Sequence, residues 1–375
     1  MSAQGLNSDI NIGSKRLHVQ TSVSETAETI ITNVFDSGRI VETHSVPVAE
    51  NKNNGELEAA VREQHQEVVS DIELLFYIAE KVRQVKHPVS CNKLGLVLLN
   101  RGFIDEAIAF FELGISIDHE YAEAYNNLGL CYFQQDDLAR AEEMFRKGLN
   151  ITRNFADLNL NLGRVYIEKK AYHEAVRSFE AALEINNQYF EAHYFMARAL
   201  LLSLIENVDN GQLPPASIRA KRIEEHMSRA ASLFKPFVNE DYDLAKKAIE
   251  DKNFSEAEKH YSEAFTKTNR RMDLSFENEF FLKFMYGGKG KDNQFIGRYV
   301  ERLKYAINDY PEYADLHNNL GIAYLIMCRN LFLKALEEFR KALRINPLFK
   351  KAEKNLKLAE NDGKGFLILL RAILK

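Results

Sequence analysis

Three stretches of the chain share one pattern: residues 94–111 read LGLVLLNRGFIDEAIAFF, residues 128–145 read LGLCYFQQDDLARAEEMF, and residues 162–179 read LGRVYIEKKAYHEAVRSF. Each stretch begins with Leu-Gly, carries an alanine at the same later position and ends in phenylalanine, and successive copies start 34 residues apart. A fixed period of this length is typical of proteins that stack copies of one supersecondary unit. The sequence therefore predicts a repeat architecture.

The pattern resembles the tetratricopeptide repeat, a pair of antiparallel helices joined by a short turn. Small residues such as Gly95 and Ala107 let neighbouring helices approach closely, while Leu94, Leu98 and Phe111 fill the space between them. The resemblance covers about residues 88–360 and implies a mainly α fold, a right-handed α-solenoid occupying 88–375. The expected units are 88–121, 122–155, 156–189, 190–237 with an insertion at 206–217, 238–271, 280–313 and 314–349.

The last unit, 314–349, repeats the pattern with a difference. Leu320, Gly321 and Tyr324 suit its first helix, whereas the residues expected in its second helix are displaced by two positions; these are Ala335, Phe339, Ala342 and Pro347. A basic amphipathic helix at 350–361 is expected to cap the open end of the solenoid. An apolar tail, FLILLRAILK at 366–375, follows it.

The first 87 residues do not follow the repeat. Lys15 to Thr21, Thr29 to Phe35 and Arg39 to Val46 are rich in β-branched residues, and Asp36-Ser37-Gly38 supplies a short turn. These features predict a small three-stranded antiparallel β meander within residues 1–50. Residues 51–87 hold apolar side chains at a spacing close to 3.6 between Glu56 and Val85, which predicts one long linking helix.

Charge and cysteine content narrow the partners and the compartment. Lys and Arg number 49 against 54 Asp and Glu, and this net charge of −5 disfavours nucleic acid as a partner. No apolar run reaches the roughly 18 residues expected of a membrane-spanning helix. The three cysteines are far apart and odd in number, which favours a reduced, cytoplasmic protein.

Motifs of catalysis are missing from the sequence. We find no Cys-x-x-Cys, no His-Glu-x-x-His and no Gly-x-Ser-x-Gly. The run Gly287-Gly288-Lys289-Gly290-Lys291 lacks the closing Ser or Thr of a phosphate loop and follows a predicted helix. We therefore expect no catalytic, cofactor-binding or metal-binding residues, and no enzyme activity.

The resemblance implies that the first helices of successive units line a concave groove. It assigns to that groove, by repeat position, the residues Lys93, Leu96, Asn126, Asn127, Leu130, Phe133, Asn161, Arg164, Ile167, Tyr194, Arg198, Asn318 and Asn319. An amide side chain both donates and accepts hydrogen bonds, so it suits an extended peptide backbone. The same asparagines could instead serve helix packing. Some members of the family bind chaperone tails with a clamp of basic residues, which includes the second residue of the repeat. In this sequence the second residue of most units is acidic, so the resemblance does not extend to that clamp.

These observations favour a non-catalytic scaffold or adaptor that binds a partner segment through apolar anchors, with arginines setting its orientation. Two alternatives stay open. The N-terminal strands could pair between copies to build a homo-oligomeric structural scaffold, because so small a sheet cannot bury a core alone. The groove could also be closed by the protein's own helix 56–85 or by its apolar tail, which would make the chain a regulatory protein.

Overall fold

The computed structural model describes residues 5–12, 15–24, 28–48, 54–208, 211–268, 275–309, 311, 314–345, 347–348 and 350–360 of the 375-residue chain. The chain divides into two compact units, Met1–Glu279 and Phe280–Lys375. The boundary falls inside the region 88–375, which was expected to form one solenoid. The apolar tail at 366–375 lies outside the described residues.

The N-terminal sheet has four antiparallel strands, so the expectation of three was wrong. Their order is β1 (Leu6–Ile12), β2 (Lys15–Val23), β3 (Thr29–Asp36) and β4 (Arg39–Pro47). The additional strand, β1, has the sequence LNSDINI, and its Asn and Asp residues are of types that are depleted in strands generally. Pairing with β2 along its whole length outweighs that weak local preference.

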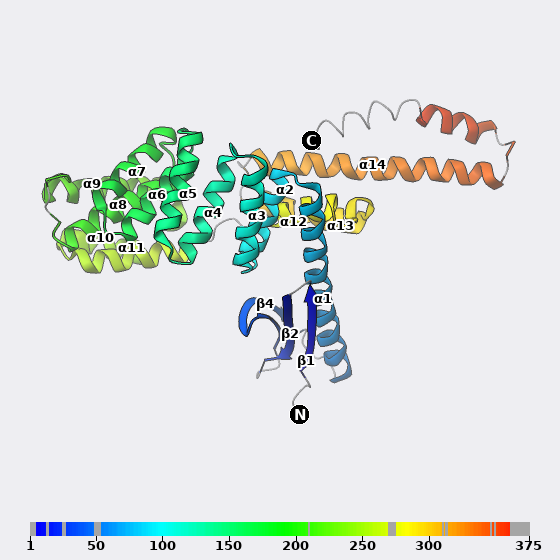
Figure 1. Cartoon of the computed structure of the whole chain (residues 1–375), viewed down its shortest axis with the longest axis horizontal. Coiled ribbons are helices and arrows are strands. Elements are labelled where there is room, and N and C mark those ends of the chain that lie inside the picture. The colour runs from blue at the N-terminus through cyan, green and yellow to red at the C-terminus, as the bar shows by residue number, and fades with distance from the viewer. Residues whose placement is uncertain are drawn as a thin grey trace. The chain divides into compact units, whose positions relative to one another are not determined.

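The long linking helix is α1 (Asn54–Val85), and it covers one face of the sheet (Figure 1). Leu17, Val19 and Val34 of the sheet are buried, as are Val68 and Ile72 of the helix. The small sheet therefore has a core only because α1 supplies its other half.

A polar contact lies inside this packed layer. The His65 ring on α1 is 2.7 Å from Ser8 Oγ and 2.9 Å from Thr21 Oγ1, and Thr21 Oγ1 is 2.9 Å from Thr32 Oγ1. Burial lowers the pKa of His65, which favours the neutral ring between two hydroxyl groups. The contact joins three strands to one helix position and so specifies where α1 sits on the sheet.

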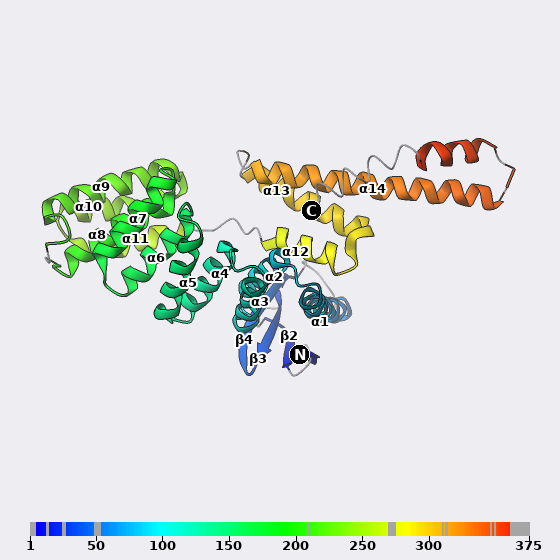
Figure 2. The ribbon, with the colours of Figure 1, turned by 45° about the horizontal axis from the view of Figure 1, so that its top comes forward.

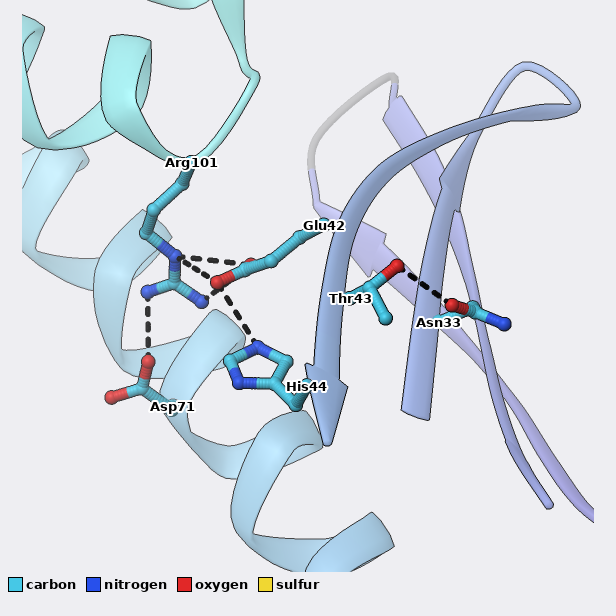
Figure 3. A network of polar contacts seen from close by, with 6 residues as sticks. All are labelled: Asn33, Glu42, Thr43, His44, Asp71 and Arg101. Carbon is cyan, nitrogen blue, oxygen red and sulfur yellow. Dashed lines mark hydrogen bonds and ion pairs between the residues drawn. The ribbon is translucent and has the colours of Figure 1, made fainter. Parts of the chain in front are cut away.

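The sheet is joined to the first repeat by a buried arginine (Figure 3). Arg101 Nη2 lies 2.9 Å from Glu42 Oε2 on β4, and Arg101 Nη1 lies 2.7 Å from Asp71 Oδ2 on α1. The next residue, Gly102, has φ of 81°, and a Cβ there would be 2.4 Å from Val41 O. Glycine is needed at this turn both for its backbone conformation and for the close approach of β4.

Five helix pairs follow α1 in the described part of the first unit. They are α2 (Pro88–Asn100) with α3 (Ile104–Ile117), α4 (Ala122–Gln134) with α5 (Leu138–Ile151), α6 (Ala156–Glu168) with α7 (Tyr172–Ile185), α8 (Phe190–Ile205) with α9 (Ala216–Leu233), and α10 (Glu240–Glu250) with α11 (Phe254–Thr268). A short 3-10 helix, η1 (Lys235–Phe237), precedes α10. The expectation of a mainly α solenoid with a small N-terminal sheet is confirmed.

The Leu-Gly and Phe positions of the repeat meet inside each of the first three pairs. A Cβ placed on the glycine of the first helix would lie 2.5 Å from ring atom Cε1 of the phenylalanine of the second helix; the pairs are Gly95 with Phe111, Gly129 with Phe145, and Gly163 with Phe179. All three phenylalanines are fully buried. We call this contact the glycine seat. It explains why the two residue types recur together.

The turn inside each pair also follows the period. Gly102, Asp136 and Lys170 have φ values of 81°, 60° and 58°, and each precedes the repeat's second-helix alanine by five residues. A left-handed residue at this place stops the first helix and reverses the chain. Each 34-residue unit in this region therefore contains one such turn and one glycine seat.

The second unit contains the end of α12 (Ser275–Met285), the 3-10 helix η2 (Lys289–Lys291), α13 (Asn293–Asp309) and α14 (Ala314–Ile345). Residues 350–360 are also helical. The expected turn within unit 314–349 does not form, because α14 is one uninterrupted helix of 32 residues. The repeat pattern alone did not reveal this, since both halves of α14 keep their helical periodicity and differ from a regular unit by a two-residue insertion.

Among the described residues, α14 has the length and composition of a helix that could cross a membrane. Its most apolar 18-residue window has a mean hydropathy of 1.2, and 22% of that window is buried. One such helix is weak evidence, because helices that pack against other helices reach the same composition.

Candidate peptide-binding surface

The residues predicted to line the groove lie on two parts of the structure. Most are on α2, α4, α6 and α8, and each of these helices contacts the next. Asn318 and Asn319 lie on α14, in the second unit, where Asn318 is exposed and Asn319 is half-buried. We call the set on α2, α4, α6 and α8 the inner-face residues.

The asparagines of the inner face bond to one another. Asn127 Nδ2 donates to Asn92 Oδ1 at 2.9 Å, and Asn161 Nδ2 donates to Asn126 Oδ1 at 2.9 Å. Arg164 Nη1 donates to Asn161 Oδ1 at 3.0 Å. All four asparagines are at most 8% exposed. These amides hold successive first helices in register, which favours the packing role over direct reading of a peptide backbone.

Apolar side chains of the inner face are more open. Leu96, Leu130 and Phe133 are half-buried, on two neighbouring helices. The Arg164 guanidinium lies over the Phe133 ring, 4.9 Å from its centroid, and 5.4 Å from the centroid of Phe195. This places a cation between two aromatic rings beside an apolar strip.

Ile167 contributes less to such a surface than its repeat position implies. Its side chain is 5% exposed and belongs to the core of α6. The family's inner-face positions therefore do not all present side chains to solvent in this chain.

Two inner-face residues, Tyr194 and Arg198, are covered by another helix of the same chain, α11. The Tyr194 ring stacks on Phe265 of α11, with centroids 4.0 Å apart and planes 7° from parallel. Arg198 Nε donates to Glu258 Oε1, also on α11, at 3.0 Å. Burial under this helix leaves Tyr194 2% exposed and raises the pKa of its hydroxyl. Both residues are therefore already occupied by α11.

The packing of α11 explains how it reaches this position. In the first repeats, each first helix contacts the first helix of the next unit; at α8 that contact is made by α11, the second helix of its pair. Aromatic residues support the arrangement, because Phe237 of η1 packs near Tyr194, Tyr242 and Tyr261. The α10–α11 pair thus departs from regular repeat stacking.

A second segment lies near the other end of the inner face. Lys93 Nζ donates to Asn278 Oδ1 of α12 at 3.1 Å. Burial lowers the pKa of Lys93, against the opposing effect of the Glu277 and Glu123 carboxylates. Two segments of the chain, α11 and the start of α12, therefore contact inner-face residues on α8 and α2.

Three contact residues were missed by the sequence: Glu258, Phe265 and Asn278. The repeat period places Ala257, Tyr261 and Ala264 of α11 at core positions of the unit 238–271, and all three are buried. Glu258 directly follows Ala257 in the sequence, and Phe265 directly follows Ala264. Their position beside core residues was the only sequence feature that could have indicated a contact with another helix. It does not specify which earlier helix they contact.

One group of ligating side chains occurs in the described part of the chain, formed by Asp241, His260 and Glu263, whose ligand atoms lie within 4.8 Å of one another. Asp241 also pairs with Lys267. Hydrogen bonds from Lys267 hold the pKa of the Asp241 carboxyl below its usual value, against the effect of burial. The bound ammonium supplies the positive charge that these carboxylates need, so the cluster is an ion-pair network between α10 and α11.

Comparisons with known proteins agree with the repeat geometry. Family models of the tetratricopeptide repeat match residues 89–154 and 156–189. No curated protein shows a significant match to the chain.

Solved structures give weaker likenesses. YrrB, described as a TPR protein with an unusual peptide-binding site, is 16% identical over 54% of this chain and 97% of its own, with a TM-score of 0.37. Pseudomonas aeruginosa pilF is 18% identical over 62% of this chain and 96% of its own, with a TM-score of 0.38. The first TPR of Spaghetti (RPAP3), bound to the HSP90 peptide SRMEEVD, is 21% identical over 32% of this chain and 94% of its own, with a TM-score of 0.31.

These scores are too low to carry an argument about this chain. The assignment rests on the two family models, on the glycine seats and on the turns that recur with the period of 34. Residues 89–189 of the chain form tetratricopeptide repeats.

Proposed function

We propose that the protein is a non-catalytic interaction scaffold whose inner face, on α2, α4 and α6, binds an amphipathic helix of a partner protein. Leu96, Leu130 and Phe133 supply apolar contacts, and Arg164 supplies a positive charge beside them. Each apolar anchor buried there would contribute roughly 1.5–3 kcal/mol, against about 0–1 kcal/mol for an exposed ion pair. Apolar contacts would therefore provide the affinity and Arg164 the orientation.

The observation that carries this proposal is the way α11 binds α8. It offers an aromatic anchor, Phe265, to Tyr194 and an acidic residue, Glu258, to Arg198. The two α11 residues are seven apart, which is close to two helical turns or about 10 Å. A partner helix with the same combination would match Phe133 and Arg164 on the adjoining helices, because those residues offer an aromatic ring and a guanidinium again.

Tetratricopeptide repeats are generally non-catalytic, and we extend this to the whole chain as part of the proposal, together with the lack of a cofactor.

We also propose a cytoplasmic location. Burial raises the pKa of the Cys91 thiol to about 11 and that of Cys131 to about 12, so both behave as packed, unreactive side chains. Cell fractionation tests the location.

The experiment is affinity capture of partner proteins from lysate of the source cells, followed by quantitative mass spectrometry. The test variant is Leu130→Ala with Phe133→Ala, and the matched control is Ile117→Ala with Ile151→Ala, which shortens two exposed side chains on second helices. We expect the test variant to reduce capture of at least one specific protein about tenfold or more, which corresponds to 1.4 kcal/mol.

The control variant should capture that protein as the wild type does, and all three proteins should melt at similar temperatures. Equal capture by the test variant and the wild type would show that the inner face does not bind partners. Replacing Asn127 would not test partner binding, because this side chain is buried and bonded to Asn92.

A second candidate function is regulation by the chain's own helix. The expected internal occupants were residues 56–85 or the tail; α1 instead packs on the sheet, and it is α11 that lies on Tyr194 and Arg198. If α11 limits access to the inner face, Glu258→Gln should weaken its hold and raise capture of the partner. Unchanged capture by Glu258→Gln would count against regulation and leave the scaffold proposal intact.

The homo-oligomeric scaffold through the N-terminal strands also stays a proposal. The edge strands β1 and β4 each pair with one neighbour, and β4 exposes Ile40 and Val46. Replacing both with lysine should dissociate such an oligomer in light scattering, since charges on an edge strand oppose strand pairing.

A further inference from the structure

The glycine seat is filled in the first three repeats and open in α14. Among the described residues, nothing lies within 4 Å of the position that a Cβ on Gly321 would take, whereas Gly95, Gly129 and Gly163 each face a buried phenylalanine. The phenylalanine that the sequence pairs with Gly321 is Phe339. Because α14 is continuous, Phe339 lies 18 residues further along the same helix, about 27 Å away.

The missing turn has an identifiable place. Asn330 precedes Ala335 by five residues, as Gly102, Asp136 and Lys170 precede the alanines of the first three repeats. Here Asn330 is helical and 5% exposed, and its Nδ2 donates to Asn293 Oδ1 at 3.0 Å. Contacts with the α13 side of the molecule therefore hold α14 straight at the residue where a regular unit would turn.

Each half of α14 lies beside a different helical segment (Figure 2). The helix α13 packs against α14, and the helical residues 350–360 lie beside its C-terminal half, where Arg340 Nη2 is 2.8 Å from Glu360 Oε1. Leu336 and Ala352 are buried in this part. A regular repeat unit would also have a contact between its first and second helices. Within the described residues, the two halves of α14 do not make this contact, because the helix is continuous.

The open side of α14 is a continuous apolar stripe. Eighteen residues make five turns at 3.6 residues per turn, so Gly321 and Phe339 lie on the same side of the helix. Asn330 is nine residues from each and lies on the opposite side. The stripe also holds Leu325, Cys328, Phe332 and Ala335, all of them exposed or half-buried.

We propose that two copies of the chain exchange this contact, with Phe339 of each copy packed in the glycine seat at Gly321 of the other. The two α14 helices would run antiparallel about a two-fold axis level with residue 330, midway between Gly321 and Phe339. A two-fold axis makes the contact reciprocal, because residue i meets j and j meets i. The product is a domain-swapped dimer in which neither helix bends.

The register set by the axis places small residues opposite large ones. Positions that face each other have numbers summing to 660, which brings Gly321 to Phe339, Ala335 to Leu325 and Cys328 to Phe332. Alternating small and large side chains interdigitate at close helix separation, as they do in the first three repeats. The stripe is therefore complementary to itself in this one antiparallel arrangement.

A lipid bilayer is the competing occupant, given the length and composition of α14. The stripe occupies one side of the helix, while Arg329 and Asn330 on another side contact Gly290 O. A helix surrounded by lipid is apolar on all sides, whereas a one-sided stripe suits packing against another helix. The observations favour a second copy of the chain.

The test uses crosslinking between two differently labelled full-length proteins, both carrying Cys328→Ser. One carries Gly321→Cys and the other Phe339→Cys; the native Cys91 and Cys131 are buried. With a short bis-maleimide reagent, we expect the mixed sample to give a crosslinked heterodimer several-fold above the homodimer formed by either protein alone. A mixture that forms no more crosslinked dimer than the separate proteins would overturn the proposal.

Two further measurements close the alternatives. In light scattering, Gly321→Leu should raise the dimer dissociation constant at least tenfold, while the control Gly297→Leu, at another glycine with open space around it, should not. A dimer unaffected by Gly321→Leu would assign dimerisation elsewhere. Co-flotation of the wild type with vesicles of phosphatidylcholine and phosphatidylglycerol, lost in Phe332→Asp, would assign the stripe to a membrane and overturn the proposal.

Discussion

Residues 88–189 and α14 carry the same repeat signature, yet they use it differently. In the first three repeats the glycine, the turn and the phenylalanine act within one helix pair, and all three phenylalanines are fully buried. In α14 the two-residue insertion accompanies a continuous helix, and no residue in the described part of the chain lies within 4 Å of a Cβ placed on Gly321. The difference teaches that the repeat pattern encodes a contact between two helices without specifying that both helices belong to one hairpin.

The largest effect that can sharpen this comparison is truncation of the seated phenylalanine. Phe145→Ala should lower the free energy of unfolding by about 3–5 kcal/mol, because it empties a fully buried site between α4 and α5. Phe339→Ala, at a half-buried site, should cost about 1 kcal/mol or less in dilute protein. Urea unfolding followed by circular dichroism measures both. Equal losses would mean that α14 closes on itself in solution.

The glycines give a smaller effect of opposite sign in the two regions. Gly129→Ala should destabilise by about 1–3 kcal/mol, since the new Cβ would lie 2.5 Å from Phe145. Gly321→Ala should stabilise the dilute monomer by up to about 1 kcal/mol, because alanine favours an unobstructed helix. Thermal melts of the two variants, with Gly297→Ala as the exposed-glycine control, measure the contrast. Destabilisation by Gly321→Ala in dilute protein would break the comparison.

The smallest effect concerns histidines: His193 and His317 are each the fourth residue of their repeat units, 190–237 and 314–349. His193 is buried, and its Nδ1 is 2.9 Å from His226 Nδ1, whereas His317 on α14 is exposed. Burial, with the nearby His193 and Arg222, lowers the pKa of His226 to about 4. The unfolded chain therefore takes up this proton at higher pH than the folded chain, and stability falls as pH drops below about 6.5.

Between pH 7.5 and pH 5.5 this histidine should remove about 1 kcal/mol of stability. His226→Gln should abolish that part of the pH dependence. Urea unfolding at the two pH values provides the measurement. A pH dependence that survives in His226→Gln would assign it to other groups.

Much of the candidate surface could be predicted by repeat position, although its chemistry could not. The sequence identified Asn126, Asn127 and Asn161 as inner-face residues, and the structure shows that their amides bond to other side chains there. Whether an amide faces a ligand or a neighbouring helix depends on distances of an ångström or less between helices. A repeat position does not carry that information.

The sequence by itself determined the helix pairs between residues 88 and 189, because their contacts are local and recur with the period of 34. It also determined the α1 helix and the β3–β4 hairpin, whose signals are likewise short-range. Only the tertiary structure decided three features: the polar strand β1, the placement of α11 on α8, and the continuity of α14. Each depends on contacts that local periodicity does not specify: β1 needs its pairing with β2, α11 its docking on an earlier helix pair, and Asn330 its bond to Asn293.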